Sequence, residues 1–185
     1  MKKLKLLPYL FIASIMAISC TNTSDDVEVI VPNYTDLLGT WELESYSYTG
    51  YATYDTNGVV DTGATYIANS IVLDAEVDIT SNPNEIITSG TGSLDVSLNF
   101  IPLGITTNVT EDSVSFDGNG TWTNSGDTIT ISFASFGSNV NNSSGYISSI
   151  TDSTATIMGT AEFSEDTLNV TLNHHINYTL NLTKD

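Results

Sequence analysis

Apolar and polar residues alternate along most of the chain from Tyr34 onward. The run over residues 71–80 is representative: Ile71, Leu73, Ala75, Val77 and Ile79 point one way, while acids at positions 74, 76 and 78 and a threonine at position 80 point the other way. Side chains with a period of two point to opposite faces of a β-strand, which leaves one face for a core and one for water. Windows with a helical period are short. The pattern predicts an almost entirely β-stranded domain over residues 34–185.

Tight turns divide these runs into about eight to nine strands. The separating segments, such as residues 81–84 and 124–127, are rich in Asn, Asp, Ser, Gly and Pro, which is typical of hairpin turns. Closing a meander of such strands removes free edges that would pair with other chains. We therefore predict an all-β, antiparallel meander β-barrel, with a two-layer sandwich as the alternative. The stretch 137–145 is almost entirely Ser, Asn and Gly, and is predicted to be an exposed loop.

Two glycine-tryptophan motifs open alternating runs. Residues 37–43 read Leu-Leu-Gly-Thr-Trp-Glu-Leu, and residues 120–122 read Gly-Thr-Trp. We interpret them as corresponding places in one curled sheet. Structural roles are assigned to four residues: Gly39, Trp41, Gly120 and Trp122.

The apolar face of the first strand changes register after the tryptophan. It passes from Trp41 and Leu43 to Tyr46 and Tyr48. One extra residue in a strand produces such a change, so a β-bulge is expected near Ser45.

The first residues of the chain have a different composition. Residues 1–19 combine a basic start, an apolar run and a small Ser19, as a secretory signal peptide does. Cys20, the only cysteine, follows Ala17-Ile18-Ser19. This sequence resembles a bacterial lipobox, which implies a lipid on Cys20 and a flexible acidic tether over residues 20–33. We expect a lipoprotein of the cell envelope, anchored in the outer membrane and facing either the periplasm or the cell surface.

Acidic residues dominate the charge. The chain has 22 acids, four lysines and a formal charge of -18. Removing residues 1–19 would leave Lys184 as the one lysine. Such a surface repels nucleic acid, because binding phosphates requires cationic groups. It also repels anionic headgroups, so membrane attachment would depend on the lipid at Cys20.

The motifs together resemble the lipocalin-like domain of Bacteroidetes lipoproteins. The similarity rests on residues 38–43, on Gly120-Thr121-Trp122, on the hairpin 125–131 and on the closing run 178–184. It implies a barrel with Trp41 packed across its closed end. Lipocalins often pair this tryptophan with an arginine of the last strand. The chain has no arginine, so Lys184 is the only cation left for that place.

Candidate chemistry is sparse. His174 is the polar side chain within the apolar stripe of the last strand, and His175 should face the other way. Adjacent strand residues point apart, so the two histidines cannot bind one metal from a regular strand. No phosphate-binding glycine loop follows a strand. We predict no enzyme, no metal and no cofactor.

The preferred function is a lipid-anchored, non-catalytic barrel that binds a small hydrophobic or amphipathic ligand in its interior. The candidates for the cavity lining are Phe100, Phe116, Phe133, His174 and Tyr178. The alternative is a solid barrel that serves as a cell-surface interaction or glycan-binding module, because small barrels can be filled by their own side chains. The candidates for its exposed aromatic surface are Tyr48, Tyr51 and Tyr54, although strand-pair packing would also explain them. The partner in that case is unidentified.

Overall fold

The computed structural model describes residues 34–56, 59–125, 128–136, 140–167 and 170–184, which lie in one compact unit, Val31–Asp185. The predicted signal peptide 1–19, the lipidation site Cys20 and the tether 20–33 lie outside the described residues. No helix of the described part is long and apolar enough to cross a membrane.

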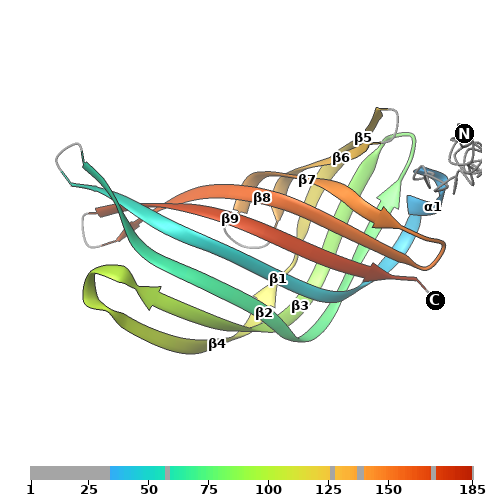
Figure 1. Cartoon of the computed structure of the whole chain (residues 1–185). Helices are drawn as coiled ribbons and strands as arrows, with labels where there is room; N and C mark the ends of the chain where they lie inside the picture. The colour runs from blue at the N-terminus through green and yellow to red at the C-terminus, as the bar shows by residue number, and fades with distance from the viewer. Residues whose placement is uncertain (1–33, 57–58, 126–127, 137–139, 168–169, 185) are drawn as a thin grey trace, which may run out of the picture. The chain divides into compact units, whose positions relative to one another are not determined.

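Antiparallel strands make up nearly all of the described unit (Figure 1). One short helix, α1 (Tyr34–Leu37), precedes them, and a 3-10 turn, η1 (Ile101–Leu103), joins two of them. The described strands are β1 (Gly39–Thr56), β2 (Val59–Thr80), β3 (Glu85–Phe100), β4 (Ile105–Ser115), β5 (Gly118–Ser125), β6 (Thr128–Phe136), β7 (Val140–Ile150), β8 (Thr154–Thr167) and β9 (Val170–Thr183).

Eight strands close into a hydrogen-bonded ring. Its order is β1-β2-β3-β5-β6-β7-β8-β9, and β9 pairs again with β1. In the described part, β4 pairs only with β3, along residues 91–100, whereas β5 pairs with residues 85–88 of β3. The predicted antiparallel meander barrel of eight to nine strands is confirmed.

The sheet continues beyond the closed ring. β8, β9, β1, β2, β3 and β4 extend past β5, β6 and β7 as an open, curved sheet that ends in three hairpins (Figure 1). We term this extension the arm, and it comprises residues 48–56, 59–70, 97–111, 161–167 and 170–176. The arm was not predicted, because strand lengths alone do not reveal which part of a long strand lacks a neighbour.

Trp41 closes the end of the barrel opposite the arm. Its ring is fully buried, and Nε1 donates a hydrogen bond of 2.7 Å to the carbonyl of Leu37 in α1. The ammonium of Lys184 lies 4.3 Å from the ring centroid and donates to the carbonyls of Leu38 (2.6 Å) and Asp36 (3.2 Å). Lys184 therefore takes the place that the lipocalin resemblance assigns to an arginine.

Trp122 of β5 joins the same end of the barrel to neighbouring segments. Its buried ring donates from Nε1 to the carbonyl of Thr80 at 2.8 Å, and the ring of Tyr34 lies 6.3 Å away. Gly120 is required nearby, since a Cβ there would lie 2.3 Å from the carbonyl oxygen of Ser132. Gly39 has a φ of +119°, a conformation that favours glycine.

The predicted β-bulge of the first strand is confirmed. The register between β1 and β9 shifts between Leu43 and Ser45. As a result, Tyr46 is buried in the barrel and Tyr48 faces the same side.

Part of the predicted loop 137–145 is instead strand. β7 begins at Val140, and Ser143 is buried while Gly145 lies against the hydroxyl of Tyr178. The prediction was wrong for residues 140–145, where the inward residues Ser143 and Gly145 are small. Tyr178 of β9 fills the space that larger side chains would otherwise occupy, so the alternation is hidden. Residues 137–139 lie outside the described residues.

Aromatic rings fill the interior of the closed ring. Phe136 is their centre, with centroid distances of 5.2 Å to Phe133, 5.9 Å to Tyr46, 6.0 Å to Tyr178 and 6.1 Å to Phe116. All five residues are buried. Ring pairs at these distances pack as in a protein core.

Candidate functional site

The arm presents a concave face that continues the inner face of the barrel. Residues opposite each other on paired strands share a face of the sheet, and the register places Ala52 beside both His174 and Ala64. We term this face the trough, and its members are Tyr48, Ala52, Ala64, Tyr66, Leu98, Glu111, Phe163, Glu165, Leu172 and His174. They come from all six strands of the arm.

Tyr66 of β2 lies at the base of the trough. Its hydroxyl lies 3.3 Å from the carbonyl oxygen of Tyr51 and 3.2 Å from Nδ1 of His174. The hydroxyl has one proton, so it can donate to only one of these atoms. Both contacts are hydrogen bonds when the hydroxyl donates to the carbonyl of Tyr51 and accepts from Nδ1–H of His174. The ring of Tyr48 meets Tyr66 edge to face at 5.9 Å.

His174 of β9 stacks on Phe163 of β8, with centroids 4.4 Å apart and rings parallel within 1°. Its Nε2 lies 3.4 Å from a carboxylate oxygen of Glu165, but this approach does not meet the geometry of a hydrogen bond. Nε2 is thus a buried polar atom without a hydrogen-bond partner among the described residues. Leaving such an atom unsatisfied costs about 1–3 kcal/mol. A ligand group that bonded to Nε2 would recover part of that free energy.

Two carboxylates give the trough a negative potential. Burial, with a smaller contribution from the nearby charge of Glu111, raises the pKa of Tyr48 to about 12. Burial also raises the pKa of Tyr66, with smaller contributions from Tyr48 and from Glu165. The described part of the chain has one lysine, Lys184, which lies at the closed end, and no arginine. The carboxylates of the trough are therefore not neutralised by a lysine or arginine.

The raised tyrosine pKa values predict a loss of stability at alkaline pH. In the unfolded chain a tyrosine ionises near pH 10, whereas Tyr48 ionises near 12 in the folded protein, and burial also raises the pKa of Tyr46 and Tyr178. The contribution of these neutral tyrosines to the free energy of unfolding is complete below pH 10 and should decline as pH rises from 10 to 12. The slope should approach about 1.4 kcal/mol per pH unit for each fully buried tyrosine, and less for half-buried Tyr48, where water screens the charge.

Urea unfolding followed across this pH range, together with the ultraviolet absorbance of phenolate, measures the effect. The variant Tyr46→Phe should show a shallower decline. Unfolding free energies that stay constant from pH 10 to 12 would contradict the assigned burial.

The structure does not bring the five predicted lining residues together. Phe116, Phe133 and Tyr178 belong to the packed core of the closed ring. His174 lies in the trough, and Phe100 is exposed at the end of β3. An apolar stripe on a strand predicts the inward face, but not whether that part of the strand lies in the ring or in the arm.

The three predicted surface tyrosines also lie on two faces. Tyr51 is exposed on the convex face, where its ring stacks on His175 at 4.8 Å. Tyr48 and Tyr54 share the concave face, because they pair with Tyr178 and Leu172 of β9. His175 faces away from His174, as predicted, and its Nδ1 contacts Glu162 at 3.0 Å.

Several residues of the trough were missed as site residues. Tyr66, Phe163, Glu111 and Glu165 occupy alternating positions like many others in the chain. Their proximity depends on the pairing of β1 with β9 and of β2 with β3. A prediction of strand register would have been the signal needed to find them.

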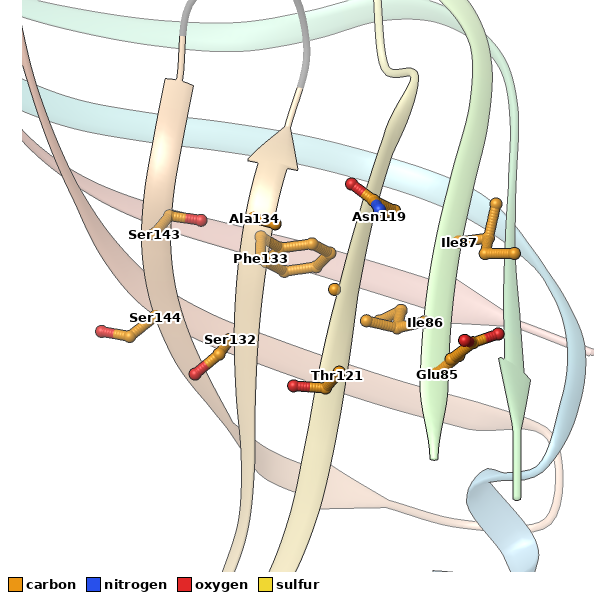
Figure 2. A pocket seen from close by; sticks show the side chains of 11 residues that line it. Glu85, Ile86, Ile87, Asn119, Thr121, Ser132, Phe133, Ala134, Ser143 and Ser144 are labelled. Atoms are coloured by element: carbon orange, nitrogen blue, oxygen red, sulfur yellow. The ribbon is translucent and has the colours of Figure 1, made fainter. Parts of the chain in front are cut away.

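Two shallow grooves cross the outer wall of the closed ring. One has a volume of about 580 Å³ and runs over β3, β5, β6 and β7; Figure 2 shows Ser144, Ser132, Thr121 and Glu85 in one row across these strands. The other, about 310 Å³, lies over Gly159 beside Tyr146 and Met158. These two grooves are hollows of the outer surface. Among the described residues no group of three or more His, Cys, Asp or Glu could hold a metal ion.

Comparisons with known proteins leave the family of the chain undetermined. No protein family matches the sequence, and no curated protein matches it. A solved structure of Ail, the attachment invasion locus protein of Yersinia pestis, aligns with 78% of this chain and 99% of its own, at 9% sequence identity and a TM-score of 0.28. A likeness this weak carries no argument about function. The chain is shown to be an all-β barrel, and its membership of the lipocalin-like group stays a prediction.

Proposed function

We propose that the protein is a non-catalytic binding protein of the cell envelope, anchored by a lipid on Cys20, and that it holds an amphipathic small molecule in the trough. The observation that carries the proposal is Nε2 of His174, which has no hydrogen-bond partner among the described residues and lies 3.4 Å from Glu165, on a ring that stacks on Phe163. Binding sites commonly combine apolar walls with a few converging polar groups.

The chemistry of the trough favours a ligand with a cationic head that donates hydrogen bonds. When Nδ1 of His174 carries the proton toward Tyr66, Nε2 is an acceptor, and the neighbouring Glu165 carboxylate accepts as well. An ammonium group could donate to both. The half-buried apolar side chains of Leu98, Phe163 and Leu172 would contact the aliphatic part of the ligand. This differs from binding inside the barrel, where aromatic rings occupy the space.

A pair of ligands with one chain length and opposite head charges tests the proposal. Residues 21–185, prepared without lipid, would be titrated calorimetrically with dodecylamine and with laurate below their aggregation limits. Dodecylamine should bind about tenfold more tightly or better, because the carboxylates attract its head and repel that of laurate.

Neutral variants of the carboxylates separate this site from the general acidity of the surface. Glu165→Gln should lower the affinity for dodecylamine by about tenfold, since a charge-assisted hydrogen bond is lost. Glu76→Gln, an exposed position of β2 outside the trough, should leave it unchanged. Equal losses from both variants, or equal affinities for the two ligands, would contradict the proposal.

Glycan binding is a second candidate, favoured by the groove beside Tyr146. That ring is exposed, and the groove also contains the amide of Asn177 and the hydroxyl of Thr160. An aromatic ring flanked by hydrogen-bonding groups suits a sugar ring. Loss of binding to a glycan array in Tyr146→Ala, with folding retained, would support it; an array on which the unmodified protein binds nothing would exclude it.

A further inference from the structure

We propose that the hairpin joining β3 to β4 inserts into the interfacial region of a lipid bilayer. We term it the apolar hairpin, and it comprises residues 98–109. This would be a membrane contact of the folded domain itself, separate from a lipid on Cys20, and it goes beyond ligand binding in the trough.

Exposed apolar side chains cluster at the tip of the apolar hairpin. The exposed fractions are 38% for Phe100, 46% for Ile101, 69% for Leu103 and 52% for Ile105. Val109, further along β4, is exposed to 42%. Contiguous apolar side chains at this exposure mark a contact surface, whereas single ones are common on any protein.

The same segment has no charge. From Val96 to Thr110 the sequence contains no Asp, Glu or Lys, although the chain as a whole carries 22 acids. The nearest acids in sequence, Asp95 and Glu111, lie on the two strands below the tip. A surface that must approach a negatively charged or strongly hydrated layer would be repelled by acids. The uncharged, apolar tip is therefore complementary to an uncharged lipid interface, whereas the acidic surface of the rest of the protein is not.

The shape of the tip favours a bilayer over a folded partner. Phe100, η1 and Gly104, whose φ of +62° closes the turn, form the convex turn that joins β3 to β4 beside β2. A convex apolar projection needs a pocket on a folded partner, while a bilayer deforms around it. Interfacial segments bury their apolar face about 5–10 Å into the boundary between headgroups and acyl chains.

The apolar hairpin is continuous with the trough. Phe100 pairs with Ala64 of the trough and with Ile105 of β4. A tip held in the bilayer would open the end of the trough toward the lipid, which is where amphipathic molecules concentrate. The membrane contact nevertheless does not depend on the trough being occupied.

Vesicle flotation tests the proposal. Residues 21–185 without lipid retain every described strand, so the acyl chains of a lipoprotein would not obscure the result. We expect binding to phosphatidylcholine vesicles, with weaker binding when phosphatidylglycerol is added, because the rest of the domain is acidic. Leu103→Asp should reduce the fraction bound by about tenfold, since it removes an inserted apolar side chain.

Val72→Asp is the matched control. Val72 is 63% exposed on β2, outside the hairpin, and its replacement should leave vesicle binding unchanged. Glu165→Gln, which lies on β8 outside the hairpin and weakens ligand binding in the trough, should also leave it unchanged, so a failure of ligand binding is distinguishable from a failure here. Circular dichroism establishes that each variant is folded.

Three results would overturn the proposal. One is an unmodified protein that stays with the unbound fraction, and another is equal binding by Leu103→Asp and the unmodified protein. The third is a sedimentation measurement in which the unmodified protein self-associates through Leu103 but does not bind vesicles. The hairpin would then be a contact surface for a second copy of the chain.

Discussion

Replacing Trp41 with alanine is expected to lower the free energy of unfolding by about 4 kcal/mol. The ring is fully buried at the closed end, and it joins α1, through the carbonyl of Leu37, to the last residues of β9, through Lys184. Its removal leaves a cavity and also leaves the ammonium of Lys184 without its aromatic partner. Urea unfolding followed by circular dichroism measures the change.

A double-mutant cycle isolates the cation contact. Lys184→Met should cost about 1 kcal/mol by itself, because the carbonyls of Asp36 and Leu38 lose their donor. In the Trp41→Ala background the cost should be smaller by about 0.5–2 kcal/mol, the contribution of a cation over an indole ring.

An unfolding midpoint of Trp41→Ala equal to that of the unmodified protein would contradict the assigned role of the closed end.

Filling the trough is expected to abolish amphiphile binding. Ala64 lies on the concave face between Ala52 of β1 and Phe100 of β3, so an indole at this position would occupy the space above Tyr66. Ala64→Trp should weaken dodecylamine binding by more than about tenfold, because steric exclusion removes the contacts of the whole aliphatic chain. Calorimetric titration measures the affinity.

The next residue provides the control. Thr65 points to the convex face, where it pairs with Tyr51 and Asn99. Thr65→Trp adds the same ring to the same strand and should leave binding intact. If both variants lost dodecylamine affinity equally, or if both retained it, the trough would not be the binding site.

The closed barrel could be predicted because its residues satisfy local rules. Inward positions of β1, β2 and β6 hold apolar side chains at a period of two between the register shifts, and the bulge near Ser45 follows from the register change between Leu43 and Tyr46. β7 was partly missed for a physical reason: Gly145 and Ser143 are small because Tyr178 fills the space opposite them. Local periodicity cannot show a complementarity between strands that are distant in sequence.

The trough depends even more on non-local pairing. His174 was identified as a polar residue on an apolar stripe, but its partners Tyr66, Phe163 and Glu165 were not. Each of the three is unremarkable in its own strand. The register of β9 against β1 and β8 brings them together, and the pairing of β8 with β7 ends at Thr160, before Phe163 and Glu165.

Ligand binding in the trough is tested by mapping amide chemical-shift changes as dodecylamine is added to residues 21–185. We expect the largest changes on Tyr66, Phe163 and His174, on the concave face of the arm. Changes confined to Tyr146 and Met158 would place the ligand in the outer groove over Gly159 instead. That result would contradict the trough as the binding site.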